Sequence, residues 1–356
     1  MLKQTPPESL CVIRLSAIGD TCHALAVVRA LQDAWPETRI TWIIGRTEAA
    51  LMADIPDVEF IIFDKARGLA AYRDVRAQLG RRRFDAALCL HASLRANALS
   101  ALVRAPIRLG YDRARARDFQ WLVTNRRIDP QPRQHVQDAM LEFAKAVGAP
   151  PRPLRWDIPL AAAHREFAAA YAEEGRPLVV ISPCSSERWR NFRNWSAEHY
   201  AAVANHARRK YGCRVIVTGG NSATEQAYGD TITRLCPDAV NLVGRTSLKQ
   251  LLALLEVAAV LVCPDSGPAH MATTVQTPVI GLYATSNPER TGPYLSRDLT
   301  VNAYPEAVQR FLGKTAEEVR FGERVRDPAA MGLIRVAHVN ERLDRVLGGQ
   351  RSAAAG

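Results

Sequence analysis

One turn in the second half of the chain has the residue types and spacing of a phosphate-binding site. An apolar run over residues 257–262 ends just before it, and helix-compatible residues follow it. The turn consists of Asp265, Ser266, Gly267, Pro268, Ala269 and His270. A strand that ends in this way directs backbone N–H groups and a helix dipole at phosphate oxygens. We therefore expect a phosphorylated ligand, with Asp265 and His270 beside it for a sugar hydroxyl. The alternative is an N-cap at an ordinary strand–helix junction.

A second candidate comes directly after the first predicted strand. Residues 16–20, Ser-Ala-Ile-Gly-Asp, open a helix there. A dinucleotide site needs G-x-G-x-x-G in such a turn, and this turn has one glycine, which argues against a nicotinamide enzyme. Asp20 is a candidate general base that faces a cleft. Its alternative role is to cap the helix.

Arginines gather after the first predicted strand of the second half. Arg188, Arg190 and Arg193 lie among aromatic residues in residues 182–195, where they could neutralise a diphosphate leaving group. A solvated charged loop would also explain some of them. Glu225, in the helix after Gly219 and Gly220, could reach a ribose hydroxyl. The chain has no D-x-D pattern, so it shows no carboxylate pair for a metal–diphosphate complex.

Basic residues of the first half are concentrated around two loops. They are Lys65, Arg67, Arg73, Arg76, Arg81, Arg82, Arg83, Arg113, Arg115 and Arg117. They could form one anion-binding rim, or they could be solvated or paired surface side chains. His91 is expected to face the cleft, whereas His23 is expected to pack in the first turn of its helix.

The elements that must hold these residues alternate between strands and helices. Predicted strands cover residues 11–15, 39–44, 59–63, 86–90, 178–181, 214–218, 260–263 and 279–283. Predicted helices cover residues 23–34, 69–82, 93–103, 196–210, 223–235, 247–256 and 331–347. The alternation predicts an α/β fold with two Rossmann-like domains, whose parallel sheets face an interdomain cleft.

Prolines at residues 150–153 and 159 mark the predicted boundary. We expect an N-terminal Rossmann-like domain over residues 1–160 and a C-terminal Rossmann-like domain over residues 161–330. A C-terminal helix and frayed tail over residues 331–356 could pack back on the first domain.

Composition narrows the class of protein. The 356 residues are 47% hydrophobic and 23% charged, as in a globular protein, and the net charge of +11 suits an anionic partner such as nucleic acid, lipid or a small substrate. Seven cysteines without a C-x-x-C pair give neither a disulfide framework nor a zinc pattern, and three of them lie in or beside apolar runs, where burial is expected. No signal peptide or membrane span is expected, so the protein should be cytoplasmic and meet a membrane only from its surface.

The three ordered motifs, S-A-I-G-D, the basic tryptophan-containing loop and P-D-S-G-P-A-H, together resemble the ADP-heptose lipopolysaccharide heptosyltransferases of glycosyltransferase family 9. The resemblance spans residues 11–293. It implies a GT-B fold and an inverting, metal-independent transfer of heptose from ADP-heptose to the inner core, with no cofactor.

The resemblance also implies roles for individual residues. Asp20 matches the catalytic aspartate, which takes the proton of the acceptor hydroxyl while ADP leaves from the opposite face. The matches on the ADP-sugar side are Arg193, in place of a lysine, Glu225, Thr246 within residues 245–248, Asp265, Ser266, Gly267, Pro268 and His270. The matches on the acceptor side are Lys65, Arg67, His91, Arg95, Arg113, Arg115 and Arg117.

Residues 91–95 and 113–121 look most like the branch that adds the first heptose to phosphorylated Kdo. The implied partners are ADP-heptose, Kdo-lipid A and the inner-leaflet surface at the cytoplasmic face of the inner membrane, without nucleic acid. The alternatives are a heptosyltransferase for the second core heptose or for a protein adhesin, a GT-B-like sugar-nucleotide epimerase, and a basic nucleic-acid-binding protein.

Overall fold

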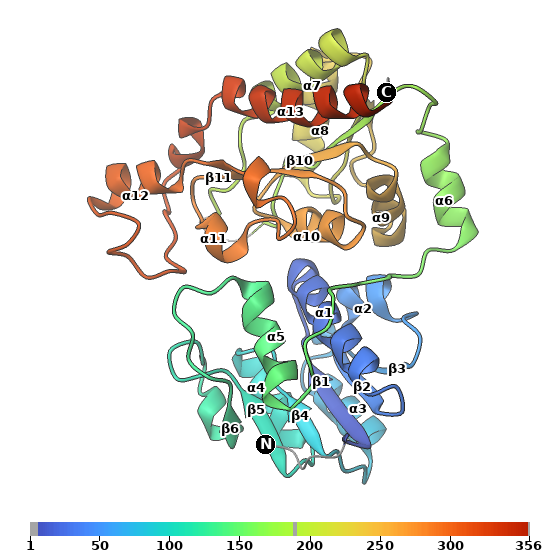
Figure 1. The fold of residues 1–356 in the computed structure, drawn as a ribbon, viewed down its shortest axis with the longest axis vertical. Coiled ribbons are helices and arrows are strands. Elements are labelled where there is room, and N and C mark those ends of the chain that lie inside the picture. Colours follow the sequence, from blue (N-terminus) through green and yellow to red (C-terminus); the bar gives the residue numbers. More distant parts are fainter. Residues whose placement is uncertain (1–5, 188–190, 355–356) are drawn as a thin grey trace. The chain divides into compact units, whose positions relative to one another are not determined.

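The computed structural model describes residues 6–187 and 191–354. The chain divides into two compact units, Met1–Pro159 and Leu160–Gly356. Each unit is a parallel β-sheet with helices packed on it, so the predicted α/β fold class is confirmed (Figure 1).

The first unit contains a six-stranded sheet of order β3-β2-β1-β4-β5-β6, with every pair parallel. The strands are β1 (Ser9–Ile13), β2 (Arg39–Gly45), β3 (Val58–Phe63), β4 (Ala86–Leu88), β5 (Ile107–Gly110) and β6 (Arg126–Arg127). The helices are α1 (Ile18–Ala34), α2 (Arg46–Met52), α3 (Leu69–Leu79), α4 (Leu94–Leu102) and α5 (Val136–Ala146), with 3₁₀ turns η1 (Lys65–Arg67) and η2 (Gln120–Leu122). The strand order reverses between β1 and β4, where such sheets bind ligands.

The second unit repeats this topology in the order β12-β11-β10-β7-β8-β9. Its strands are β7 (Leu178–Ile181), β8 (Arg214–Val217), β9 (Val240–Asn241), β10 (Val260–Pro264), β11 (Val279–Tyr283) and β12 (Val301–Asn302). Its helices are α6 (Ala162–Ala169), α7 (Ala197–Tyr211), α8 (Ala223–Leu235), α9 (Leu248–Glu256), α10 (Gly267–Thr274), α11 (Pro288–Thr291), α12 (Tyr304–Leu312) and α13 (Val336–Ala354), with 3₁₀ turns η3 (Arg297–Leu299) and η4 (Ala330–Leu333). The equivalent reversal lies between β7 and β10.

The central strands are apolar because helices cover both faces of each sheet. Every residue of β7, β10 and β11 is buried. All seven cysteines are free and buried, as expected for the three that lie in or beside apolar runs. His23 is also buried and lies 2.8 Å from Gln137 Oε1 through its Nδ1, which confirms its packing role.

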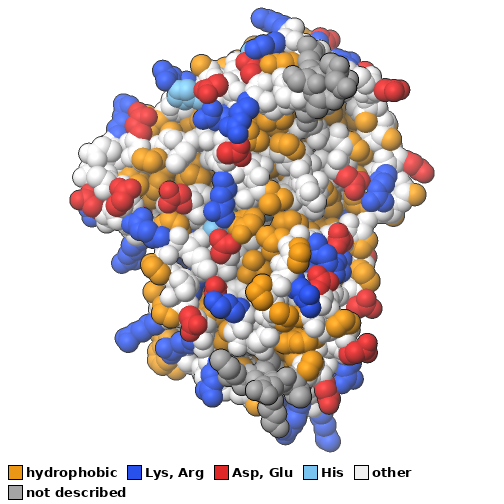
Figure 2. Space-filling view, in the orientation of Figure 1, with side chains coloured by type: hydrophobic (Ala, Val, Ile, Leu, Met, Phe, Trp, Pro, Cys, Tyr) orange, Lys and Arg blue, Asp and Glu red, His pale blue; other side chains and the backbone are white. Residues whose placement is uncertain are grey.

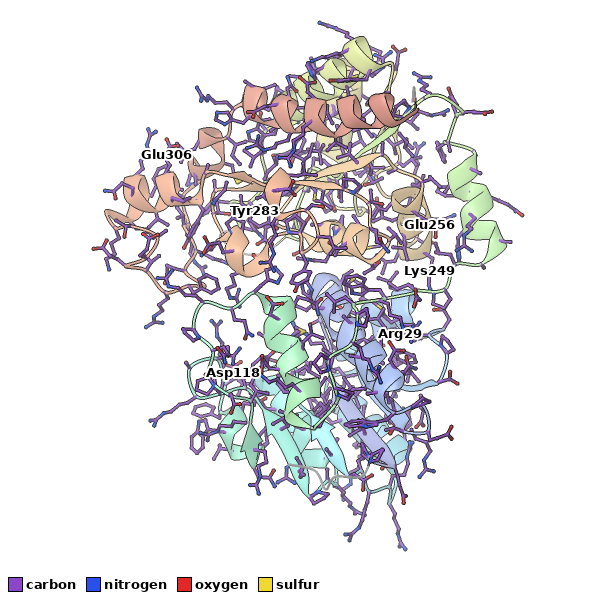
Figure 3. All side chains as sticks on the ribbon, in the orientation of Figure 1. Arg29, Asp118, Lys249, Glu256, Tyr283 and Glu306 are labelled. Atoms are coloured by element: carbon purple, nitrogen blue, oxygen red, sulfur yellow. The ribbon has the colours of Figure 1, made fainter. Side chains whose placement is uncertain are left out.

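The segment before Pro159 is hydrogen-bonded to the first unit, and the segment after Pro159 is hydrogen-bonded to the second unit. Arg29 of α1, labelled in Figure 3, donates to the carbonyls of Trp156 and Asp157 at 2.9 and 2.7 Å. On the other side, Arg165 of α6 donates to Glu256 of α9 at 3.1 Å.

The structure differs from the sequence-based expectation in its short and peripheral elements. The sequence patterns did not predict β5, β6, β9, β12, α2, α5, α6, α11 or α12. Strands of two to four residues carry little periodicity, whereas α5 and α12 are amphipathic and do carry the helical period that sequence reasoning missed. The C-terminal helix α13 packs on α7 of the second unit, where Asp344 bonds His206 and Lys210 at 2.7 and 2.8 Å.

No helix among the described residues is long and apolar enough to cross a membrane. Lys and Arg side chains are mixed with acidic ones on the face drawn in Figure 2.

Candidate functional site

The predicted site residues follow the two central strands of each sheet. Asp20 comes after β1 and His91 after β4 in the first unit, while Arg193 comes after β7 and Asp265 after β10 in the second. These are the carboxyl ends of the strands at the point where the strand order reverses. The topology therefore collects, within each unit, residues that are far apart in the sequence.

Asp20 lies in the first turn of α1 and is partly exposed, at 36% for its side chain. Its Oδ2 forms an ion pair with Arg14 and accepts the N–H of Ala17 at 3.3 Å. The second contact is a capping interaction, so the capping alternative is correct as far as it goes. Both contacts orient the carboxylate. One face of the carboxylate still reaches solvent.

Arg14 is the main residue of this site that sequence reasoning missed. Its side chain is 9% exposed, and it donates through Nη1 to the carbonyl of Leu90 at 2.6 Å. It thus joins the ends of β1 and β4 to the candidate base. A charged residue within the apolar run of residues 11–15 was the available signal, because an arginine is rarely buried without a partner.

His91 lies near Arg14 and Asp20, and its ring is neutral. Burial, and then the nearby Arg14, lower the pKa of His91 to about 3. The N–H of Leu15 donates to Nδ1 at 3.3 Å, which leaves the ring proton on Nε2. His91 can therefore offer a hydrogen-bond donor at neutral pH, but it adds no positive charge for an anionic ligand.

Glu48 is a second acidic residue near the end of β1 that the sequence did not suggest. It is buried in the first turn of α2, and burial raises its pKa. A Cβ on Gly45 would lie 2.5 Å from Glu48 Oε2 and 2.4 Å from the Leu15 carbonyl oxygen. Gly45 therefore allows this close approach of α2 to the end of β1.

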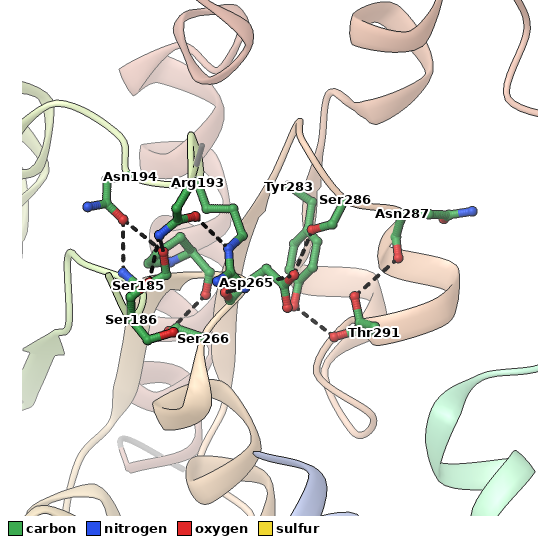
Figure 4. A network of polar contacts seen from close by, with 12 residues as sticks. Ser185, Ser186, Arg193, Asn194, Asp265, Ser266, Tyr283, Ser286, Asn287 and Thr291 are labelled. Carbon is green, nitrogen blue, oxygen red and sulfur yellow. Dashed lines mark hydrogen bonds and ion pairs between the residues drawn. The ribbon is translucent and has the colours of Figure 1, made fainter. Parts of the chain in front are cut away.

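Arg193 and Asp265 form the centre of a polar network in the second unit (Figure 4). Nη1 of Arg193 donates to the Asp265 carbonyl at 2.8 Å and lies 3.4 Å from Oδ2, while Nε donates to Asn191 Oδ1 at 2.9 Å. Ser286 donates to the same Asp265 carboxylate at 2.8 Å. The Nη2 group of Arg193 has no partner among the described residues, so two donors remain for a ligand.

The helix that follows Asp265 begins as the sequence predicts. Ser266 is the N-cap residue of α10, but its side chain makes no capping bond and donates instead to the Pro264 carbonyl at 3.1 Å. The backbone N–H of Gly267 is one of those at the start of a helix that have no intrahelical partner, and Pro268 has none to satisfy. Asp265, Ser266 and His270 are all buried. The Ala269 N–H already donates to the Ser266 carbonyl at 3.2 Å, so the start of α10 can donate the N–H of Gly267 to an anion's oxygen.

Glu225 has a structural role in the helix start of α8. Its carboxylate accepts the N–H of Gly220 at 2.7 Å and the hydroxyl of Ser222 at 2.7 Å, and Ser222 caps the helix in return. A Cβ on Gly220 would lie 2.8 Å from Glu225 Oε2, so this glycine makes room for Glu225. Thr246, in the loop before α9, is partly buried. Glu225 follows β8, which pairs with β7, and Thr246 follows β9, which pairs with β8, so both lie at the same sheet edge as Asp265.

The basic residues of the first unit do not form one cluster. Lys65 and Arg67 follow β3, whereas Arg113, Arg115 and Arg117 follow β5, and four strand spacings of ~4.8 Å separate these strands by ~19 Å. Arg82 pairs with Glu59 near the start of β3, which places it at the opposite, amino edge of the sheet. The basic residues therefore do not form the single rim that the sequence suggested. They form two groups, one on each side of Asp20, and Arg82 belongs to neither group.

Several of these arginines are engaged within the protein. Arg115 pairs with Asp112 and donates to Gln134 Oε1 and the Asp129 carbonyl, each at 2.8 Å. Arg67 pairs with Asp74 of α3. By contrast, no hydrogen bond or ion pair within residues 6–187 and 191–349 engages the side-chain charges of Lys65, Arg95, Arg113 or Arg117.

Within the described part of the chain, no three His, Cys, Asp or Glu side chains come together where they could hold a metal ion. Arg188 and Arg190 lie outside the described residues.

Known proteins resemble this chain along almost its whole length. The family model of glycosyltransferase family 9 (heptosyltransferase) matches residues 72–318. The lipopolysaccharide core heptosyltransferase OpsX of Haemophilus influenzae is 39% identical over 334 residues, which are 94% of this chain and 95% of that protein. Lipopolysaccharide heptosyltransferase 2 of Escherichia coli K12 is 24% identical over 80% of this chain and 85% of its own.

Solved structures agree on the fold. The Escherichia coli ADP-heptose lipopolysaccharide heptosyltransferase II has a TM-score of 0.72 at 20% identity, with 96% of this chain and 99% of that one covered. A glycosyltransferase family 9 structure from Veillonella parvula has a TM-score of 0.75 at 19% identity, with 96% and 97% covered. The fold is thus the GT-B fold of these enzymes. With an arginine-held carboxylate after β1 and a helix that starts directly after β10, the chain belongs to glycosyltransferase family 9 and is a heptosyltransferase.

Proposed function

We propose that this protein transfers the first heptose from ADP-heptose to Kdo-lipid A, the inner core of lipopolysaccharide, at the cytoplasmic face of the inner membrane. The observation that carries the acceptor class is the identity of 39% to the core heptosyltransferase OpsX over 94% of the chain. ADP as the leaving group is supported by an Escherichia coli heptosyltransferase whose structure contains ADP.

The second unit binds the donor in this proposal. Arg193 Nη2 and the start of α10 give a cation and a backbone donor for the diphosphate, and the buried Asp265 holds the arginine in place. Thr246 and Glu225 follow the neighbouring strands, where the nucleoside would extend along the sheet edge. His270 and Asp265 are left for the sugar hydroxyls.

The first unit binds the acceptor. Asp20 accepts the proton of the attacking hydroxyl as the new bond to the anomeric carbon forms and the bond to the diphosphate oxygen breaks. A carboxylate is a weak base, so the proton moves late, when the hydroxyl has become acidic. His91 donates a hydrogen bond to the acceptor through Nε2. The anionic acceptor is attracted by Lys65, Arg67, Arg95, Arg113 and Arg117. Arg115 supports the loop after β5 that carries Arg113 and Arg117.

The diphosphate takes up the negative charge of the transition state. Fixed donors at Arg193 and the first turn of α10 stabilise it there, and donors that are already oriented do so without reorganising. This arrangement removes the need for a divalent ion. A single displacement of this kind inverts the anomeric configuration.

Purified protein with ADP-heptose and Kdo-lipid A provides the test. We expect stoichiometric release of ADP, a product one heptose heavier, an inverted anomeric linkage by NMR, and full activity in excess EDTA. Acceptor that already carries its first heptose should not react. Transfer only to that heptosylated core would overturn the first-heptose assignment, and ADP-heptose consumption without acceptor would favour an epimerase. A rate lost in EDTA and restored by Mg²⁺ would contradict the metal-free mechanism.

A further inference from the structure

Large hydrophobic side chains are exposed together at one place on the first unit. The described chain has ten exposed large hydrophobic side chains, and four of them belong to the start of α4 and to the segment around η2. These four, which we call the apolar patch, are Leu94 at 64%, Phe119 at 61%, Trp121 at 55% and Leu122 at 65% exposure. Large apolar side chains gathered in this way on a surface mark an interaction site more often than single ones do.

Hydrogen bonds hold the two parts of the patch together. The N–H of Leu94 donates to the Asp118 carboxylate at 3.1 Å, and Asn97 of α4 donates to the Asp118 carbonyl at 2.6 Å. Asp118 is labelled in Figure 3 and marks the segment between β5 and β6. The start of α4 and the η2 segment are therefore one surface.

A buried glutamine anchors this surface to the sheet. Gln120 is fully buried, donates through Nε2 to the Cys89 carbonyl at 2.9 Å and accepts the N–H of Tyr111 at 3.1 Å. Its neighbours Phe119 and Trp121 are exposed while it is buried, so the fold itself holds these rings in solvent. A loop free to rearrange would cover them.

The chain around the patch is strongly basic. Residues 91–127 contain eight arginines and two acidic residues, Asp112 and Asp118, a net +6 within a chain of net +11. Asp112 is paired with Arg115, and Asp118 accepts the N–H of Leu94. Arg95, Arg113 and Arg117 remain exposed.

We propose that the apolar patch and the arginines around it dock this protein onto an anionic lipid surface. Amphipathic Trp and other apolar side chains enter the boundary between headgroups and acyl chains, while arginines pair with anionic headgroups. A second copy of this chain is a poorer occupant, because two equally basic surfaces repel one another.

The position of the patch explains what docking would achieve, and this part rests on the proposed function. Leu94 is three residues after His91, at the same sheet edge as Asp20. A lipid-anchored acceptor keeps its acyl chains in the bilayer, so docking by this edge brings its sugar to Asp20 without extraction of the lipid.

Vesicle flotation with the full chain, in the absence of donor and acceptor, tests the docking alone. We expect at least about tenfold tighter binding to phosphatidylcholine vesicles that contain phosphatidylglycerol than to phosphatidylcholine alone, since several arginines contribute. The double variant L94S/L122S keeps Trp121 and should bind the anionic vesicles about tenfold or more weakly, because two leucines no longer enter the lipid.

The matched control is L295S/L312S, which removes two exposed leucines of the second unit. It should bind as the wild type does, and both variants should keep the wild-type Tm. The emission of Trp121, taken as the difference between wild type and W121F, should shift to shorter wavelength on anionic vesicles. With a soluble, delipidated Kdo acceptor, L94S/L122S should turn over at the wild-type rate.

Equal binding of wild type and L94S/L122S, no binding to anionic vesicles, or a wild-type dimer that L94S/L122S converts to monomer would each overturn the docking proposal. Absence of transfer to the soluble acceptor by wild type would instead overturn the proposed function, since vesicle binding is measured without any reaction.

Discussion

At the scale of single residues, the contacts of Asp20 are compatible with both roles that the sequence presented as alternatives. Its Oδ2 accepts the N–H of Ala17, which caps α1, and also pairs with Arg14. The partly exposed carboxylate is thereby oriented by groups on two sides, as a positioned base requires. A useful variant must keep the cap and remove the base.

Asp20→Asn meets this condition, because an asparagine oxygen can still accept the N–H of Ala17. We expect kcat to fall by about 10²–10⁴, the usual contribution of a general base, while the Kd for ADP stays within a few-fold. Steady-state kinetics and calorimetry measure the two quantities, and unchanged amide exchange at Ala17 shows that the cap is intact. The Tm is not a suitable control, because the variant also loses the ion pair with the buried Arg14. A variant with more than about half of the wild-type kcat would leave Asp20 only its capping role.

His91 predicts a dependence of stability on pH. Its pKa is about 3 in the folded protein against an ordinary 6.5, so the unfolded state binds more protons between these values. Stability is therefore lost as the pH falls through this window, by about 2 kcal/mol between pH 7 and pH 5. His91→Asn keeps an acceptor for the Leu15 N–H but does not titrate. Between pH 7 and pH 5 the unfolding free energy of this variant should therefore fall by about 2 kcal/mol less than that of wild type.

Urea unfolding of wild type and H91N at the two pH values gives this difference directly. Equal losses in both proteins would mean that the ring is not held in its neutral form. Because H91N also lacks the Nε2 donor, the proposed function predicts a higher KM for acceptor at neutral pH.

At the scale of elements, one loop is joined to one strand end by Arg193. The loop that follows β7 is held through Asn191 and Arg193 to Asp265 at the end of β10. In the part of the chain that the structure describes, the Nη2 group of the same guanidinium has no partner. Under the proposed function, one side chain therefore serves both the element junction and the anion site.

Arg193→Ala should weaken ADP binding and slow transfer together, because the charge meets the diphosphate in both the ground and the transition state. The expected cost is on the order of 1.5–3 kcal/mol in each, the range for charge-assisted hydrogen bonds. Faster amide exchange around residues 191–194 should accompany it.

Arg193→Lys is the matched control, since it keeps the charge but loses the planar fork of donors. It should keep ADP affinity within a few-fold of wild type. If R193A bound ADP as tightly as wild type, Arg193 would be a structural residue of the loop and no more.

At the scale of the whole molecule, two sheets with the same strand order carry different charges at their carboxyl edges. The first has basic residues on both sides of Asp20, and the second has Arg193 held by the buried Asp265. Under the proposed function this divides the work, with the anionic acceptor on the first unit and the sugar nucleotide on the second.

Reversal of two unengaged charges tests this division. Lys65→Glu with Arg113→Glu should raise the KM for acceptor at least about tenfold and leave the KM for ADP-heptose nearly unchanged, because rim charges act by long-range attraction. Added salt should weaken acceptor binding more in wild type than in the variant. If the KM for acceptor and the KM for ADP-heptose rose equally, the acceptor would bind away from Lys65 and Arg113. Arg115 is unsuitable for this test, since its reversal would break its bonds to Asp112, Gln134 and Asp129.

The sequence by itself determined the features that depend on neighbouring residues. Apolar β-branched runs such as residues 178–181 predicted strands because both faces of a parallel sheet are buried. The small residues after Asp265 predicted the start of α10, because a helix N-terminus needs a cap and tolerates proline in its first turn. Those two patterns, with Asp20 after the first strand, were enough for the fold class and for most of the candidate site.

Only the tertiary structure decided which partners these residues have. Arg14 bonds Leu90, 76 residues away, and Arg193 bonds Asp265, 72 residues away. Strand order brings each pair together, and strand order follows from packing over the whole sheet, which no local pattern contains. For the same reason the basic residues, one group in the sequence, divide between two edges of the sheet, because helix α3 returns the chain to the amino edge before Arg82.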